Sequence, residues 1–496
     1  MNAHHSSAKE MAPHMLRGSL WMVAMRWCIR CVGLVSTLVL VRVLAPQDFG
    51  ILAIATIVTG FFEVFAETGQ RLALIRHAAP TRAHLDSAWT MQMLICTCLA
   101  IGVFFSAPMV EIYFHEPNAS DIVRFLSLRV LLIGIDNIGT VAFRRDLDFQ
   151  REFRYGLYQK LGSSGLTIIL ALVLRSYWAL AIGIVAGQVI ALAIGYAMHP
   201  YRPRLSLQHV RELWGFSIWM LAGHVSSYVQ SRIDQMALGG VSDSSQLGQY
   251  SVAMDVATMP TVELAMPASR ALYPTYSRLS GELGELKKAY LMTLGIVAVI
   301  CWSTGVGVAL VSQDFVLVLL GSQWTGVIPI IPWLALSGAL FALSGTVLTV
   351  HQATGQARLF AIQSWTRVLI MTPLVFIASR TGDLERLAQA QFLATLIFVP
   401  VIFASLRSVI KLTVMDVVRT NARPAIAAAV MCAVLLPAID ALGMLHPMLR
   451  LLLSAGLGAL SFAAVLIGLW TLWGKPEGIE QTLVGAILKL WRRIRE

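Results

Sequence analysis

The sequence predicts an all-α, polytopic membrane protein, and three observations carry that prediction. First, hydrophobic residues make up 57% of the 496-residue chain, charged residues only 13%, and the mean hydropathy is +0.71. A soluble domain carries about 25% charged residues, so this chain has too little polar surface for a water-soluble body of its size. Second, apolar stretches of the roughly 20 residues that cross a bilayer as a helix recur along the whole chain. Third, basic residues gather in alternate loops between those stretches.

Fourteen apolar stretches are the predicted transmembrane helices. The first is too long for the core of a signal peptide, so we expect it to be retained as a helix behind a polar segment, 1–16. Six stretches precede a second polar segment and cover 17–44, 49–69, 86–108, 121–143, 155–175 and 177–197. Eight follow it and cover 213–239, 248–275, 286–312, 324–351, 357–379, 384–410, 420–443 and 447–473.

The distribution of Lys and Arg favours fourteen spans with both termini in the cytoplasm. Of the 38 basic residues, 25 fall on the cytoplasmic side, 5 on the opposite side and 8 within spans. Basic loops stay on the cytoplasmic side of a membrane, and a missed or invented span would invert every later loop. The net charge of +11 is therefore explained by orientation and by contact with anionic membrane lipids, without nucleic acid as a partner.

Motifs of catalysis are absent from the sequence. No loop between the predicted spans is long enough to fold into a domain, and no GxxxxGKS, GxxxxGKT, HExxH or paired CxxC occurs. Asp146-Leu147-Asp148 is an acidic pair of the kind that binds metal in nucleotide-sugar enzymes. However, it lies in a short Arg-rich loop without a surrounding Rossmann unit, so we interpret it as part of a solvated loop. The six cysteines lie in apolar stretches and are interpreted as packing residues. We therefore expect no enzyme, and no cofactor.

The polar stretch 199–213 is interpreted as an interfacial linker between two lobes. It carries Pro200, Pro203 and three arginines, with leucine and valine spaced for one apolar face. We expect an N-lobe at 1–198, a C-lobe at 214–411, two further spans at 412–474 and an amphipathic cytoplasmic tail at 475–496. A shift of 198 positions places Phe49-Gly50 on Leu247-Gly248, which is the pattern of a parallel repeat. Two six-helix lobes facing a central cavity are typical of transporters with such repeats.

Ionisable residues inside the spans are the candidate site residues. An Arg or Lys at the centre of a membrane costs roughly 2.5–3.5 kcal/mol on insertion scales. The deepest cations come from both lobes. Cations outnumber buried acids eight to six when Arg124, Glu63 and Glu263 are counted with the candidates named below. One interpretation is that these groups pair and hold helices together. The other is a shared cationic cavity for an anionic substrate, since guanidinium groups match phosphate oxygens. The candidate cations are Arg26, Arg30, Arg129, Arg232, Arg367, Arg270 and Lys160, and the candidate acids are Asp136, Asp234, Asp255 and Glu67.

Local motifs in series resemble bacterial polysaccharide flippases. The matching motifs are Val43-Leu44-Ala45-Pro46-Gln47-Asp48-Phe49-Gly50, Glu67-Thr68-Gly69, Arg145-Asp146-Leu147-Asp148-Phe149, Tyr177-Trp178-Ala179-Leu180, Leu247-Gly248-Gln249-Tyr250 and Leu320-Gly321-Ser322-Gln323-Trp324. From about residue 15 to about residue 410 the chain is similar to the Wzx-type transporters of the multidrug/oligosaccharidyl-lipid/polysaccharide exporter superfamily.

This resemblance implies a V-shaped core of twelve helices plus two more, in the cytoplasmic (inner) membrane of a bacterium. It implies that the protein flips a polyprenyl-pyrophosphate-linked oligosaccharide to the outer leaflet, driven by a proton or sodium gradient. The candidate cations would then receive the pyrophosphate or acidic sugars, and the candidate acids would carry the coupling ion. We expect a monomer, with the polysaccharide polymerase and export machinery as its protein partners.

Two alternatives stay open at this point. A cation-coupled multidrug antiporter of the same superfamily would share the fold, but its cavity should be acidic or apolar. A membrane-embedded glycan polymerase or ligase also handles lipid-linked sugars, but we would expect it to carry a larger outer loop with catalytic residues. The outer loops of this chain are short.

Overall fold

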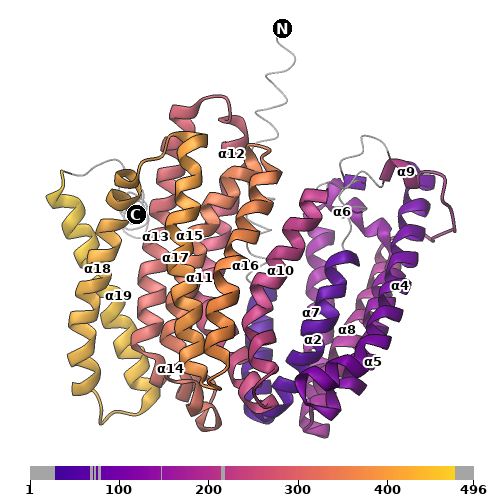
Figure 1. Ribbon diagram of the computed structural model, residues 1–496, viewed down its shortest axis with the longest axis horizontal. Coiled ribbons are helices and arrows are strands. Elements are labelled where there is room, and N and C mark those ends of the chain that lie inside the picture. The colour runs from indigo at the N-terminus through magenta and orange to yellow at the C-terminus, as the bar shows by residue number, and fades with distance from the viewer. Residues whose placement is uncertain are drawn as a thin grey trace, which may run out of the picture. The chain divides into compact units, whose positions relative to one another are not determined.

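A computed structural model describes residues 28–66, 71, 74–75, 80–146, 148–213 and 218–474. Every regular element within these ranges is a helix (Figure 1), which confirms the predicted all-α class. The predicted cytoplasmic tail at 475–496 and the polar segment at 1–16 lie outside the described residues.

The described residues of each of the fourteen predicted spans contain a helix or a bent pair of helices. A helical stretch at 28–43 comes first. It is followed by α2 (Pro46–Ala66), α4 (Arg82–Phe114), α5 (Pro117–Gly134), η1 (Ile138–Thr140), α6 (Val141–Arg145), α7 (Phe149–Leu174) and α8 (Tyr177–Met198). Next come α9 (Val210–Leu213), α10 (Ile218–Gly239), α11 (Ser244–Ala271), α12 (Tyr273–Arg278), α13 (Leu283–Leu310), α14 (Ser312–Leu319) and η2 (Ser322–Val327). The last five are α15 (Ile331–Ala353), α16 (Ala357–Ser379), α17 (Leu384–Ile410), α18 (Val414–Ala441) and α19 (Pro447–Leu472).

Among the described residues, ten helices are long and apolar enough to cross a membrane. The number becomes eleven if α5 and the segment Ile138–Arg145, which meet at a bend of 62°, form one span. Helices α10 and α11 have 22 and 28 residues, but polar side chains interrupt both. Both helices carry candidate site residues, and the count of fourteen stays a prediction.

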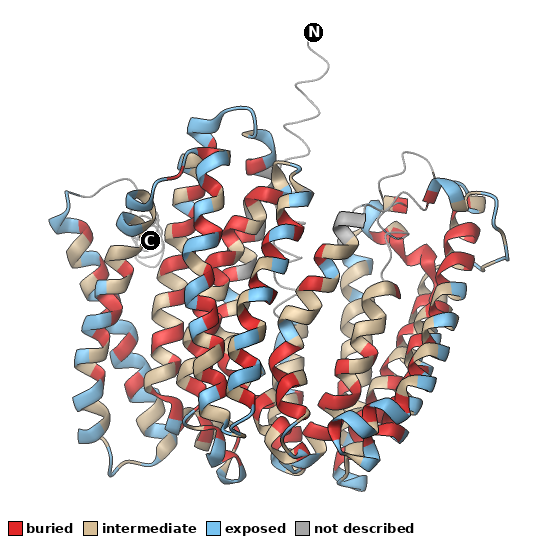
Figure 2. Ribbon diagram, viewed as in Figure 1, coloured by how far each residue is buried: buried red, intermediate tan, exposed pale blue. Residues whose placement is uncertain are grey.

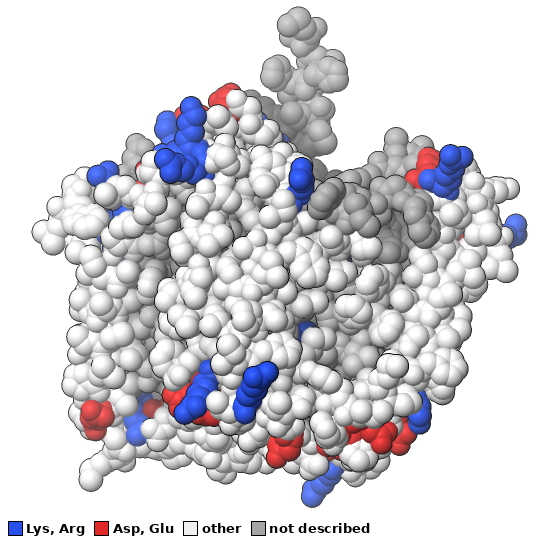
Figure 3. All heavy atoms as spheres, in the orientation of Figure 1, with Lys and Arg blue, Asp and Glu red and all other residues white. Residues whose placement is uncertain are grey.

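The surface of these helices matches a hydrocarbon environment. Large apolar side chains point away from the packed interior, among them Phe105 at 73%, Val173 at 75% and Leu369 at 70% exposed. Buried residues instead line the faces along which helices pack (Figure 2). Figure 3 shows most charged side chains near the ends of the helices and few in the band between them. A soluble protein rarely exposes this much apolar surface, so the protein is a multi-pass membrane protein.

The helices form two compact units. One unit holds the described residues up to Tyr228 together with Ser242–Gly248, and the other holds Val229–Val241 and the described residues from Gln249 onward. In the first unit α4 packs on α5, α7 on α8 and α2 on α5. In the second unit α13 packs on α15 and α18, α15 and α16 pack on α17, and α18 packs on α19. The division falls inside α10, after the predicted linker. The predicted lobes, their V-shaped arrangement and the central cavity stay predictions.

Within the first unit, α2 and α11 begin at a close helix crossing. A β-carbon added to Gly50 would overlap the carbonyl oxygen of Ser244, and one added to Gly248 would overlap the carbonyl oxygen of Pro46. A shift of 198 positions (248 − 50) maps Gly50 onto Gly248 and Pro46 onto Ser244. The two helix starts therefore touch through equivalent residues, and glycine on both sides lets their backbones meet.

Candidate functional site

In the first unit, Arg129 forms an ion pair with Glu63. Arg129 lies on α5, and its Nη1 donates a hydrogen bond to Oε1 of Glu63 on α2. The two side chains remain 31% and 20% exposed, so the pair is half-buried. It joins two helices that pack together, and an anionic ligand would have to compete with Glu63 for this guanidinium.

Asp136 is also held by a cation. It lies between α5 and η1, is 6% exposed, and accepts a hydrogen bond from Nη2 of Arg71 at 2.7 Å. The backbone N–H of Asn137 donates to its other oxygen at 2.9 Å. Nε of Arg71 reaches Gln92 on α4 at 3.5 Å. This carboxylate is therefore already neutralised by a guanidinium, which favours a structural role for Asp136.

Arg30 and Lys160 bring two cations together in the first unit. Lys160 lies on α7 against Gly33 of the helical stretch 28–43, where an added β-carbon would be 3.5 Å from Nζ. Arg30 precedes Gly33 by three residues, is exposed, and acts electrostatically on the partly buried Lys160. No carboxylate of the described chain forms an ion pair with Lys160. Because neighbouring cations repel each other, an anion bound beside them would offset that repulsion.

In the second unit, α16 carries Arg367 into the packed interior, where it is 4% exposed. With its amide oxygen facing the guanidinium, Gln230 of α10 accepts hydrogen bonds from Nε at 2.9 Å and Nη1 at 2.5 Å. Nη2 donates to Oγ1 of Thr395 on α17 at 3.4 Å, and the group lies 4.2 Å from the ring centroid of Phe341 on α15. Four helices thus hold one guanidinium through neutral groups and an aromatic face. Within the described ranges no carboxylate pairs with Arg367.

Asp234 lies on α10 and is fully buried. Its Oδ2 accepts a hydrogen bond from the Tyr250 hydroxyl at 2.9 Å, and its Oδ1 accepts one from the backbone N–H of Gln235 at 2.8 Å. Asp234 interacts electrostatically with Arg232 and Arg367. Arg232 in turn donates to the side-chain oxygen of Gln235 at 2.8 Å. Two cations and one acid interact here, so this part of the second unit carries a positive charge.

The remaining candidates are placed only in part. Asp255 lies on α11 with an exposed side chain, and Arg270 lies near the end of the same helix, where its side chain is outside the description. Arg26 and Glu67 fall outside the described residues. The roles predicted for these four residues stay predictions.

Three polar groups with defined partners are not among the candidates that the sequence suggests. Gln230 is neutral, but it lies four residues before Asp234 and therefore on the same face of α10. Arg71 looks like a loop residue in the sequence, yet it reaches Asp136. Arg450, also expected in a loop, lies in the first turn of α19 and pairs with Asp314 of α14, with the two side chains 13% and 3% exposed. Only Gln230 has a signal in the sequence, its position four residues before the candidate acid Asp234.

Fold and site together define a polytopic membrane protein that keeps buried or partly buried cations within its apolar helices. A solved structure with the same fold is the lipid II flippase MurJ in an inward closed conformation. The TM-score is 0.76, the identity is 15%, and the match covers 91% of this chain and 99% of that one.

The family follows from the sequence match. Residues 39–329, more than half of the chain, match the family model described as polysaccharide biosynthesis protein. The chain therefore belongs to this family of polysaccharide biosynthesis proteins, which confirms the resemblance to Wzx-type transporters.

Curated relatives extend the match. The succinoglycan biosynthesis transport protein ExoT of Rhizobium meliloti is 24% identical over 71% of this chain and 71% of its own length. The lipopolysaccharide biosynthesis protein WzxC of Escherichia coli is 21% identical over 67% of this chain and 68% of its own length.

Proposed function

We propose that the protein is a flippase that moves a polyprenyl-pyrophosphate-linked oligosaccharide from the cytoplasmic to the outer leaflet for polysaccharide export. It is a secondary transporter rather than an enzyme. Its family supports a polysaccharide cargo, the transport function in the name of ExoT supports movement, and the fold shared with MurJ suits a lipid-linked substrate.

The observation that carries this proposal is a pair of membrane-embedded cations, one in each unit, neither of which forms a direct ion pair with a carboxylate of the described residues. Lys160 has Arg30 as its electrostatic neighbour, and Arg367 has an amide, a hydroxyl and aromatic rings. An ionisable group within a membrane is costly and marks a substrate or ion path by default. Positive groups of this kind suit a pyrophosphate or an acidic sugar.

The alternatives fit these residues less well. A multidrug antiporter for cationic compounds needs an acidic or apolar path, whereas the candidate groups at Lys160 and Arg367 are positive. A glycan polymerase or ligase needs room for a catalytic loop, whereas α4 and α5 are separated only by His115 and Glu116. Both alternatives remain outcomes of the experiment below.

The remaining parts of the proposal concern energy, location and partners. A proton or sodium gradient drives transport, and Asp234 is the best placed acid for coupling because it interacts with Arg367 and is buried. The protein lies in a bacterial inner membrane with both termini in the cytoplasm. It works as a monomer beside the polysaccharide polymerase and export machinery.

The test measures the thermal unfolding midpoint of purified protein in detergent with three added compounds. We expect a polyprenyl-pyrophosphate-linked sugar to raise the midpoint, because a ligand at 100 times its Kd stabilises the native state by about 2.7 kcal/mol. Polyprenyl monophosphate without sugar should raise it less, and cationic dyes should leave it unchanged. Stabilisation by the dyes alone would instead favour the antiporter.

A transport measurement completes the test. Proteoliposomes with labelled lipid-linked sugar in one leaflet should show gradient-dependent movement to the other leaflet, and Lys160→Gln should slow it. Product of altered sugar chain length, rather than moved substrate, would instead favour the polymerase or ligase.

A further inference from the structure

The linker after α8 is fastened to the N-terminal end of α4 by side-chain hydrogen bonds. The Tyr201 hydroxyl and the Arg204 backbone N–H both donate to Oδ1 of Asp86, at 2.8 and 3.1 Å. Farther along, the backbone N–H of His209 donates to Oγ of Ser87 at 3.2 Å. Burial, followed by the hydrogen bond to Asp86, raises the pKa of Tyr201, so its hydroxyl stays a donor. These bonds fix the position of the linker on α4.

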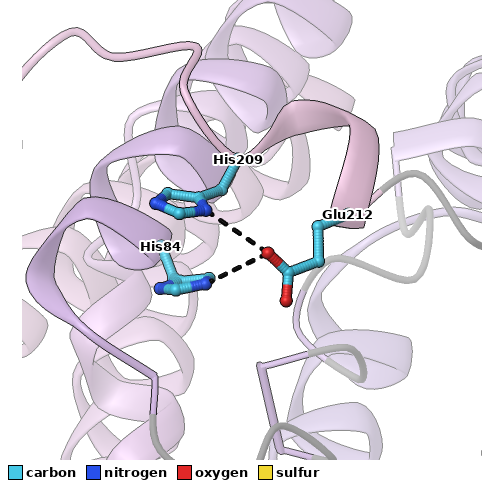
Figure 4. A group of neighbouring side chains, drawn as sticks. All are labelled: His84, His209 and Glu212. Carbon is cyan, nitrogen blue, oxygen red and sulfur yellow. Dashed lines mark hydrogen bonds and ion pairs between the residues drawn. The ribbon is translucent and has the colours of Figure 1, made fainter.

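Three side chains with metal-binding atoms meet where the linker lies on α4. His84 is in the first turn of α4, His209 precedes α9, and Glu212 lies within it. Nε2 of His84 and Nδ1 of His209 each lie 3.3 Å from the same oxygen, Oε2 of Glu212 (Figure 4). All three ligand atoms lie within 4.8 Å of one another. The imidazole rings stack with centroids 3.9 Å apart at 21°.

We propose that His84, His209 and Glu212 form a binding site for a divalent transition metal, with Zn²⁺ as its best match. Two imidazole nitrogens and one carboxylate oxygen are a common zinc donor set, and a water completes a tetrahedron. Bonds of about 2.0–2.1 Å place tetrahedral ligands about 3.3–3.4 Å apart. The two 3.3 Å separations to Glu212 have this spacing. Because the two rings are stacked at 21°, they must turn toward each other for both nitrogen lone pairs to point at one ion.

Thr81 can set the tautomer of His84 that coordinates a metal through Nε2. Nδ1 of His84 lies 2.7 Å from Oγ1 of Thr81, and the Thr81 backbone N–H donates to the same Nδ1 at 3.3 Å. That second bond puts the ring proton on Nε2, facing Glu212. Coordination by Nε2 uses the other tautomer, in which Nδ1–H donates to the Thr81 hydroxyl. Such outer hydrogen bonds orient histidine ligands and strengthen metal binding.

The position of the site suggests what the metal does. His84 is buried, His209 is partly exposed and Glu212 is exposed, so an ion can enter from water while the site stays anchored to the fold. A bound metal would hold the linker on α4, because His209 and Glu212 of the linker segment and His84 of α4 would coordinate the same ion. This role concerns the linker alone and is independent of the flippase proposal.

The test measures metal binding by the full-length protein in detergent. His4, His5 and His14 are first replaced by alanine, because they would bind zinc in their own right. After equilibration with Zn²⁺ and removal of the excess, we expect one equivalent of zinc per chain by elemental analysis. Co²⁺ in its place should show the visible absorption of a tetrahedral site.

Matched variants decide whether the three residues are the ligands. His209→Phe keeps a ring stacked on His84 but removes the nitrogen, and Glu212→Gln removes the carboxylate, so both should lose the bound equivalent. Thr81→Val should weaken affinity by about 10–100-fold, and the exposed Glu282→Gln should change nothing. Equal zinc content in the parent and in both ligand variants, or none in the parent, would overturn the proposal.

Discussion

Substitution of Arg367 tests whether its buried charge serves transport or the stability of the fold. Its hydrogen-bond partners are neutral, and Asp234, with which it interacts electrostatically, keeps the charge of Arg232 and the hydrogen bonds from Tyr250 and the Gln235 backbone. Arg367→Gln thus removes the cost of burying a charge without breaking a direct ion pair. We therefore expect the unfolding midpoint of this variant to stay level or rise, while flipping in proteoliposomes falls at least about tenfold, a loss of about 1.4 kcal/mol.

Arg450 provides the matched comparison. It pairs with Asp314 through Nε at 2.8 and 2.7 Å, and both side chains are largely buried. Arg450→Gln leaves Asp314 as an uncompensated buried charge, which costs about 3–5 kcal/mol. The midpoint of this variant should drop clearly. If Arg367→Gln lost as much stability as Arg450→Gln, the cation at Arg367 would be structural.

The contacts of Arg367 also predict that lysine can replace this arginine only in part. A planar guanidinium bonds Gln230 and Thr395 while it lies over the ring of Phe341, and a single ammonium group has no such fork. We expect Arg367→Lys to recover part of the transport that Arg367→Gln loses, because charge is restored without the full set of contacts. Initial flipping rates of the three proteins at matched expression measure this. Full recovery by lysine would mean that charge alone matters.

At the scale of helices, the crossing of α2 and α11 yields a paired prediction. Added methyl groups at Gly50 and at Gly248 would meet backbone carbonyls rather than movable side chains. Overpacking of this kind costs about 1–3 kcal/mol, so Gly50→Ala and Gly248→Ala should each lower the unfolding midpoint. Because the contacts are reciprocal, the two losses should be similar.

Gly165 on α7 is the control for this crossing. Nothing lies within 4 Å of a β-carbon added there, and alanine favours a helix over glycine by about 1 kcal/mol. Gly165→Ala should leave the midpoint unchanged or raise it slightly. A drop at Gly165 equal to that at Gly50 would show that the effect is not specific to the crossing.

The helices were predictable from the sequence, but most of their polar contacts were not. Apolar runs bounded by Pro, Gly and charged residues place helices such as α8 and α17 within a few residues, because a span has a fixed length. The pairing of Arg71 with Asp136 joins residues 65 positions apart, and only the packing of helices brings them together. His84 and His209 lie 125 positions apart (209 − 84), and the sequence does not show that the linker folds back on α4.

For the whole molecule, the membrane class follows from composition, which is a property of the entire chain and needs no contact information. The resemblance to the family rested on short motifs such as Ala45-Pro46-Gln47-Asp48-Phe49-Gly50, and the match over residues 39–329 then showed the family. These residues lie at the start of α2, where Asp48 accepts from the backbone N–H of Ala45 at 2.9 Å and from that of Tyr177 at 2.8 Å. A motif of this kind can be recognised from a few adjacent residues, because it fixes a turn and joins two helices. The number of spans cannot be recognised in this way, because it depends on the correct assignment of every helix.

That number can be tested through the two ends of the chain. Fourteen spans place both termini on one side, and the 25-to-5 division of basic residues makes that side the cytoplasm. Reporter proteins active only in the cytoplasm should therefore work when fused to either terminus, and an export-dependent reporter should be inactive at both. As a control, the export-dependent reporter placed in the loop between α18 and α19 should be active. Termini on opposite sides would mean an odd number of spans, and the 62° bend after α5 would then mark a segment that enters the membrane without crossing it.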